Sequence, residues 1–81
     1  EDQLRQFIEN QPDVMHVDML HTRMFGNKVY MDLEIEVDGD KPLWESHAVA
    51  EQVHDRVEAA FPDIKHIMIH VNPAEFAVDK G

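Results

Sequence analysis

The chain has 81 residues and no cysteine, and its 17 acidic and 7 basic residues give a formal net charge of −10 at pH 7. This charge argues against nucleic-acid backbones as partners, because phosphate binding needs clustered lysine and arginine. The absence of cysteine excludes disulfides and thiolate metal sites. A single domain of this size has a marginal core and gains stability from a partner chain or a metal.

The first expected element is a short amphipathic helix over residues 2–10, with Leu4, Phe7 and Ile8 spaced to share one face. Residues 15–25 follow as a strand rich in Val, Met, Leu and Thr. The alternation in this strand is imperfect. One apolar pair is expected on one side and a second pair on the other, namely Leu20 with Met24 and Val17 with Met19.

A second strand is expected over residues 29–37, because every odd position is apolar and every even position from 30 to 36 is polar or aromatic. A period of two is typical of a half-buried strand. Gly26-Asn27 precedes it as a turn, so the two strands are predicted to form a hairpin. We expect the apolar side to lie under the helices and the other side to carry the chemistry.

A long helix is expected over residues 43–61, with a stripe of apolar residues on one face. A third strand is expected over residues 66–71, ending at Pro73. The order α-β-β-α-β predicts an α+β two-layer sandwich, an open ferredoxin-like fold with two helices on one face of a three-stranded sheet. Residues 1–73 are predicted to form one domain. Residues 74–81 are expected to form a tail that is either frayed or packed on a neighbour through Phe76 and Val78.

Histidines and carboxylates gather in and beside the strands. They are His16, His21, His66 and His70, with Asp18, Asp32, Glu34 and Glu36. Imidazole and carboxylate ligands suit zinc and also Fe, Mn and Ni. Each residue taken singly is more often a solvated polar side chain. The helical face with His47, Glu51 and His54 is likewise more often a solvated polar face than a zinc site.

Other chemistries have weak support in the sequence. Ser46 is the single serine and directly precedes His47, so on a helix the two side chains point apart. Three glycines provide no phosphate-binding loop. A metallo-hydrolase with Glu34 as general base would need a pocket that excludes water, and an uncovered sheet face provides none. The chain is therefore expected not to be an enzyme.

The span from Val14 to Pro73 resembles the cytoplasmic C-terminal domain of bacterial cation diffusion facilitator transporters, of the YiiP and MamM kind. The resemblance rests on landmarks in order: Leu20-His21-Thr22-Arg23 with Gly26, the strand 29–37, Pro42-Leu43, Glu45-Ser46-His47, Val49-Ala50-Glu51-Gln52-Val53, Phe61-Pro62, and Ile67-Met68-Ile69-His70-Val71-Asn72-Pro73. It implies a metallochaperone-like fold, a homodimer, and a divalent metal near the dimer interface that regulates transport. It also implies a place on the cytoplasmic side of the bacterial inner membrane, attached to a transmembrane domain outside this sequence.

Carried over by the resemblance, the metal ligands fall on five residues: Asp18, Asp32, Glu34, His47 and His70. Asp18 and Glu34 stand where the zinc transporters of the family have histidine. The resemblance therefore implies a harder set of ligands, which favours Fe(II), Mn(II) or another harder ion over zinc. His66 and Asn72 are secondary candidates. Asn72 stands where some members of the family have an aspartate ligand. This departure weakens that ligand, and with it the implication of a full two-ion site in each subunit.

The expected mechanism is linkage between metal binding and dimer closure. Negative faces repel each other without metal, and a divalent cation favours the closer dimer by its difference in affinity for the two states. Below about pH 6 histidine protonation should release the ion. The alternative is a metal-independent module that dimerises through its sheet and uses its acidic face for a protein partner.

Overall fold

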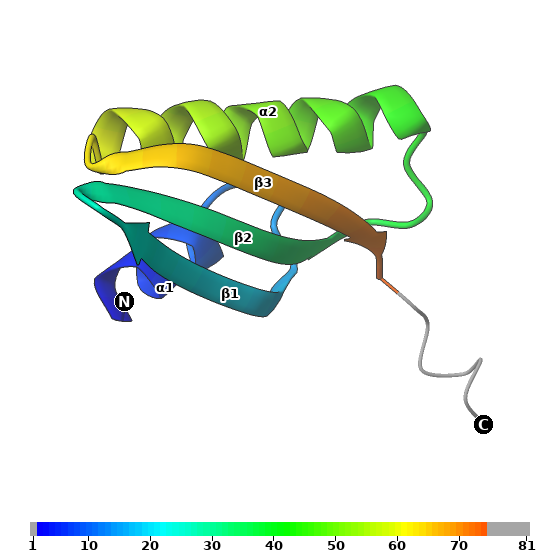
Figure 1. Cartoon of the computed structure of the whole chain (residues 1–81). Helices are drawn as coiled ribbons and strands as arrows, with labels where there is room; N and C mark the ends of the chain where they lie inside the picture. The colour runs from blue at the N-terminus through cyan, green and yellow to red at the C-terminus, as the bar shows by residue number, and fades with distance from the viewer. Residues whose placement is uncertain (1, 75–81) are drawn as a thin grey trace.

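The computed structural model describes residues 2–74. Its elements run in the expected order α-β-β-α-β (Figure 1): α1 (Asp2–Glu9), β1 (His16–Phe25), β2 (Lys28–Val37), α2 (Leu43–Ala60) and β3 (Ile64–Pro73). The three strands form one sheet in the order β1-β2-β3. The predicted fold class is confirmed. The prediction for Phe76 and Val78 lies outside the described residues.

The central strand β2 pairs with a different geometry on each side. β1 and β2 form the expected antiparallel hairpin. Gly26 in the turn has φ 62°, a left-handed conformation that glycine adopts without steric cost. β2 and β3 are parallel, and α2 is the crossover that a parallel connection needs. β3 extends beyond residues 66–71 at both ends because it pairs with β2 along nearly its whole length.

The hydrophobic core lies between the sheet and the two helices. α1 contributes Leu4 and Ile8, α2 contributes Val53 and Val57, and the sheet contributes seven buried residues: Val17, Leu20, Met31, Leu33, Ile35, Val37 and Ile64. Burying each such side chain contributes about 1.5–3 kcal/mol. An edge-to-face contact between Phe7 and Phe61, with ring centroids 5.4 Å apart, joins α1 to the end of α2. Both helices therefore cover the same face of the sheet.

The alternation expected for residues 15–25 is wrong, and a β-bulge is the reason. The register steps from Val17 opposite Ile35 to Met19 opposite Glu34, so Asp18 is an extra residue in β1. Val17 and Leu20 are both buried in the core although they are three positions apart. Met19 consequently lies on the opposite face from Val17, beside Glu34.

The sheet face that points away from the helices is called the open face here. The strand register sets its rows of side chains, which are Met19–Glu34–His70, His21–Asp32–Met68 and Arg23–Tyr30–His66. Beyond the first row, at the start of β1, lies His16, paired in register with Glu36, which is paired in turn with Asn72. The polar side of the hairpin and of β3 is thus collected on one surface, as the alternating pattern predicts.

Candidate metal centre

One end of the open face brings together side chains from all three strands. The Asn72 amide on β3 donates hydrogen bonds to Asp18 Oδ2 on β1, at 3.2 Å, and to Glu34 Oε1 on β2, at 3.3 Å. His70 lies beside Glu34 as its register partner. Four of the residues predicted from the resemblance are therefore neighbours here, although Asp18 and Asn72 are 54 positions apart in the chain.

The same end contains a second set of ligand atoms. His16, Asp18 and Glu36 each offer one atom, and these three atoms lie within 4.8 Å of one another. His16 Nδ1 is 2.9 Å from Asp18 Oδ1. Sequence reasoning named His16 and Glu36 as donors on a strand but not as ligands of one ion. The available signal was the broken alternation around Asp18, which marks the bulge.

The electrostatics of this end centre on Asp18. Desolvation raises the pKa of its carboxyl group, but hydrogen bonds with His16, Glu36 and Asn72 act in the opposite direction and hold that pKa below its ordinary value. The Asp18 carboxyl is therefore ionised at neutral pH. An ionised carboxylate beside an imidazole and further carboxylates is a suitable ligand environment for a divalent cation.

Asp32 and His66 lie further along the open face and have other neighbours. The Arg23 guanidinium donates a hydrogen bond to Asp32 Oδ2 at 3.1 Å, in an ion pair across the hairpin. The His66 ring stacks on Tyr30, with centroids 4.3 Å apart and planes 13° from parallel. A metal ion would have to compete with Arg23 for the Asp32 carboxylate.

His47 lies on the helix layer rather than on the open face. Its Nε2 is 3.3 Å from Glu51 Oε2, one turn further along α2. It lines a hollow of about 420 Å³ with Val71 and Pro73 of β3. Among residues 2–74, the sets of three or more ligand atoms within mutual reach include none of Asp32, Glu34, His47 and His70. The described subunit thus does not group His47 with the others.

A second such set lies on α2 and consists of His54, Asp55 and Glu58. His54 Nδ1 is 3.5 Å from Asp55 Oδ1. Asp55 is 79% exposed and the three residues come from adjacent turns of one helix. This arrangement is typical of a solvated helical face.

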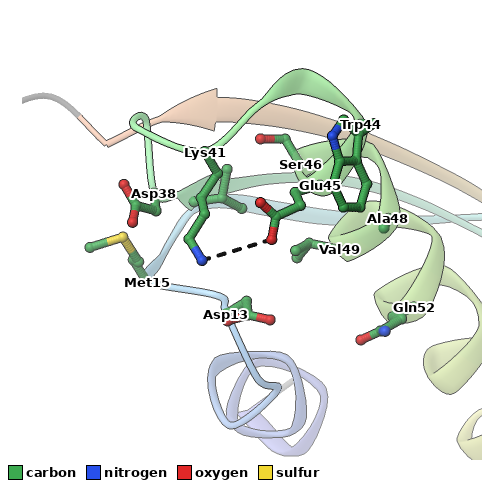
Figure 2. A pocket seen from close by; sticks show the side chains of 11 residues that line it. Asp13, Met15, Asp38, Lys41, Trp44, Glu45, Ser46, Ala48, Val49 and Gln52 are labelled. Carbon is green, nitrogen blue, oxygen red and sulfur yellow. Dashed lines mark ion pairs between the residues drawn. The ribbon is translucent and has the colours of Figure 1, made fainter.

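A hollow of about 430 Å³ lies between the start of α2 and the linker before β1 (Figure 2). Its polar feature is an ion pair between Lys41 and Glu45 at 3.8 Å, drawn as a dashed line, and Trp44 stands at its rim with 70% exposure. None of the predicted metal ligands lines it. The candidate chemistry of the molecule is therefore on the open face.

Among the described residues, no helix combines the length and the apolar character that spanning a bilayer requires.

Comparison with known proteins identifies the family. Residues 1–74 match the family model described as "Cation efflux protein, cytoplasmic domain". The cation-efflux pump FieF of Shewanella oneidensis is 34% identical over 64 residues, which are 79% of this chain and 21% of that protein. The manganese efflux system protein MneP of Bacillus subtilis is 27% identical over 60 residues, 74% of this chain and 20% of that protein.

Solved structures agree on the fold. The nickel form of a MamM CTD variant superposes with a TM-score of 0.85 at 23% identity, covering 91% of this chain and 94% of that one. A copper form gives the same TM-score at 22% identity, with 91% and 92% covered. The chain spans about a fifth of the length of the curated relatives it matches. Because the family model covers nearly the whole sequence, the chain belongs to the cation efflux protein family, as the cytoplasmic domain of such a transporter.

Proposed function

We propose that this chain is the metal-sensing and dimerising domain of a divalent-cation efflux transporter. In the proposal, two copies pair, and a cation bound at the acidic end of the open face favours a closed dimer. Closure is passed to the transmembrane domain of the full-length protein and increases transport. The full protein would lie in a bacterial inner membrane, with this domain on the cytoplasmic side.

The observation that carries the proposal is the convergence of Asp18, Glu34, His70 and Asn72. Asn72 is hydrogen-bonded to both carboxylates, and His70 is the register partner of Glu34. Two carboxylates and an imidazole form a ligand set that divalent transition metals accept. The side-chain amide of Asn72 donates hydrogen bonds to both carboxylates, so a cation that binds both of them must displace this amide.

The other predicted ligands can bind the ion only if their present contacts or positions change. Asp32 becomes a ligand only when its carboxylate leaves Arg23. His47 lies on the helix side of the edge strand β3, so it reaches an ion on the open face around that edge or from a second subunit. His66 and Asn72 are secondary ligands, and His66 must first leave its stack with Tyr30.

Electrostatics supplies the coupling between the ion and the dimer. Each copy has a formal charge of −10, so two acidic faces that approach each other repel. A bound cation offsets part of this charge and lowers the free energy of the close arrangement more than that of the open one. The equilibrium shifts by this difference in affinity and by nothing else.

The ligand set also bears on the metal. Carboxylates at Asp18 and Glu34 are hard ligands that suit Mn(II) and Fe(II) as well as Zn(II). One relative is named a manganese efflux system protein, and MamM CTD variants have nickel and copper forms. We therefore propose Mn(II), Fe(II) or Zn(II) as the bound ion.

The test combines calorimetric titration of Zn(II) and Mn(II) with small-angle scattering. For the unaltered chain we expect saturable heat and a smaller radius of the dimer at saturation. Glu34→Gln and His70→Ala should each weaken binding at least about tenfold, because each removes a direct ligand of the ion, and losing even an outer-shell partner of a ligand typically costs about 10–100-fold. His54→Ala on α2 is the matched control and should keep both the affinity and the compaction.

The proposal would be overturned if neither Zn(II) nor Mn(II) gave binding heat. It would also be overturned if His54→Ala abolished cation binding while His70→Ala left it intact. Normal circular dichroism of every variant shows that lost binding is not lost folding. His47→Ala is informative at two concentrations. If His47 acts from a second subunit, its removal weakens binding in the dimer and leaves the affinity of diluted monomers unchanged.

A metal-independent dimer is the second candidate function. Its specific support is the exposure of two large apolar side chains on the open face, Phe25 at 56% and Met68 at 59%. Such residues favour burial against a partner. Sedimentation with a chelator distinguishes the candidates: a dimer that forms equally well with and without metal, and loses affinity in Met68→Ser, supports the second.

A further inference from the structure

Residues 23–28 form the tip of the β1–β2 hairpin, and every one of them is exposed. Two large apolar side chains follow each other there, Met24 at 69% exposure and Phe25 at 56%. Neighbouring residues of a strand point to opposite faces of a sheet, and their register partners are Val29 and Lys28. Met24 therefore lies on the helix side and Phe25 on the open-face side. A partner seated on the open face would cover only one of them.

Basic side chains surround the hairpin tip, although the chain as a whole has a formal charge of −10. Lys28 follows the turn, and the guanidinium carbon of Arg23 lies 5.9 Å from the centre of the Phe25 ring. Lys65, near the start of β3, is left without a register partner where β2 and β3 shift register. All three basic residues are exposed. Three of the seven basic residues of the chain thus gather at one end of the sheet.

Acidic side chains offset part of this basic cluster. Arg23 is paired with Asp32 at 3.1 Å, and Asp63 lies in the turn before β3. Within residues 2–74, however, the side chains of Lys28 and Lys65 form no ion pair. Two unpaired ammonium groups beside two exposed apolar side chains suit a surface that is anionic and also takes up apolar groups. The headgroup region of an anionic bilayer has both properties.

The place of the hairpin tip in the molecule agrees with such a contact. α1 begins at Asp2 at the same end of the molecule as the tip, and the start of α2 lies at the opposite end (Figure 1). In the proposed function the chain is a C-terminal domain, so the transmembrane domain precedes α1 and the tip lies on the membrane side. Attachment raises the effective concentration at the bilayer to about the millimolar range, so a weak contact is sufficient.

We propose that the hairpin tip, together with Lys65, docks on the anionic lipid surface beside the transmembrane domain. This inference rests on the proposed function, because that function joins the chain to a membrane. Lys28 and Lys65 contact lipid phosphates, and Met24 and Phe25 enter the headgroup region. A fluid lipid surface covers both faces of the tip at once, whereas a flat protein surface covers one. The contact fixes the tilt of the sheet against the bilayer.

The experiment attaches the chain to vesicles in the orientation of the proposed full-length protein. A cysteine added ahead of residue 1 is coupled to a maleimide lipid, and the coupling is unique because the chain has no cysteine. The vesicles contain phosphatidylcholine, phosphatidylglycerol and a phospholipid with brominated acyl chains, which quenches tryptophan at short range. The double variant Phe25→Trp/Trp44→Phe, with its one tryptophan in the tip, should lose most of its fluorescence.

The unaltered chain is the matched control for position. Its single tryptophan, Trp44, is 70% exposed near the start of α2, at the opposite end from the hairpin tip, and should keep its fluorescence on the same vesicles. This comparison separates an oriented contact through the tip from general adsorption of the chain to lipid.

Charge provides the second arm of the experiment. Lys28→Gln and Lys65→Gln, each added to the double variant, should lower the ratio of docked to undocked chains about fivefold, because each removes one basic residue from an anionic surface. Lys41→Gln is the matched control, since Lys41 lies in the loop before α2 at the other end, and it should leave the ratio unchanged. Vesicles without phosphatidylglycerol should dock fewer chains than any single lysine variant does.

Three outcomes would overturn the docking proposal: equal quenching in the double variant and the unaltered chain, quenching that neither lysine substitution nor lipid charge changes, and no quenching at all. In the last case, a tip tryptophan shielded from aqueous iodide would assign the tip to a second copy. All vesicle measurements contain a chelator, so none of these outcomes bears on cation binding. Loss of cation binding in lipid-free calorimetry, with docking intact, would overturn the metal-sensing function alone.

Discussion

Asp18 is the residue on which most of the open-face chemistry converges. The bulge frees it from the ladder, and its side chain contacts His16 on its own strand and Asn72 two strands away. These hydrogen bonds favour the ionised carboxylate and lower its pKa despite its desolvation. The pairing of the strands therefore sets the contacts of Asp18, and these contacts keep its carboxylate negatively charged.

The lowered pKa of Asp18 has a consequence for stability in the metal-free chain. An Asp carboxyl in the unfolded chain has a pKa of about 3.9, and the folded value is lower. The stabilisation is thus complete above the unfolded pKa and is lost as pH falls through the folded pKa. Urea unfolding of the unaltered chain and Asp18→Asn should show a larger difference in unfolding free energy at about pH 6 than at about pH 2. An equal difference at both values would contradict it.

Arg23 provides a test of whether Asp32 is a ligand. The ion pair between them is exposed, and such pairs contribute about 0.2–1 kcal/mol. If the ion must displace Arg23, Arg23→Gln should tighten cation binding by roughly two- to fivefold in calorimetry. Arg56→Gln, a charge change on α2 away from the face, is the control and should tighten it less. Unchanged affinity in Arg23→Gln would remove Asp32 from the ligand set.

At the scale of elements, β2 organises the molecule. It is the central strand, and every odd residue from Met31 to Val37 is buried under the helices. Its even residues from Tyr30 to Glu36 face the open side and are matched in register by β1 and β3. The same strand therefore supplies the middle of the core and the middle of the candidate centre, which makes the position of Glu34 dependent on the packing of Leu33 and Ile35.

Leu33 should therefore be a sensitive core position. It is 0% exposed, and truncation to alanine leaves a cavity that typically costs 2–5 kcal/mol. Urea unfolding of Leu33→Ala should show a loss in that range. Leu43→Ala is the control, because Leu43 is 84% exposed and should change the unfolding free energy by less than about 0.5 kcal/mol. Comparable losses in the two variants would contradict the location of the core.

At the scale of the whole molecule, the sheet has one covered face and one open face. The two helices supply the cover, and no helix of residues 2–74 lies over the open face of the sheet (Figure 1). The family is the cytoplasmic domain of cation efflux proteins, and the chain accounts for about a fifth of such relatives. The open face is thus available to a second copy, to cations, or to both.

Charge should govern how two copies approach. If repulsion between acidic faces opposes pairing, raising monovalent salt from about 20 mM to about 500 mM should strengthen dimerisation of the metal-free chain, since the Debye length then falls from roughly 20 Å to below 5 Å. Sedimentation velocity in the presence of a chelator measures this effect. At saturating cation the salt dependence should shrink. A dimer that weakens with salt would show that attraction between opposite charges, not repulsion, controls the interface.

Local patterns in the sequence were sufficient for the element order, the fold class and the family. The period of two in residues 29–37 and the turn at Gly26-Asn27 depend on neighbours in the chain, so they can be read without coordinates. The convergence of candidate ligands on the open face was also accessible, because alternation assigns side chains to faces once the core side is known.

Only the tertiary structure decided the phase of β1, the bridging position of Asn72 and the side on which His47 lies. A bulge is a feature of the pairing between two strands, so the imperfect alternation around Asp18 signals an irregularity but does not by itself fix where the extra residue lies. Asn72 meets Asp18 and Glu34 because parallel β3 aligns with β2 in one register among several that the apolar pattern allows. Helical periodicity places His47 on a face of α2, but the packing of that helix against β3 determines which groups it can reach. The sequence alone therefore determined which residues of β2 and β3 share a face, and long-range pairing and packing determined the faces of the β1 residues and which side chains meet.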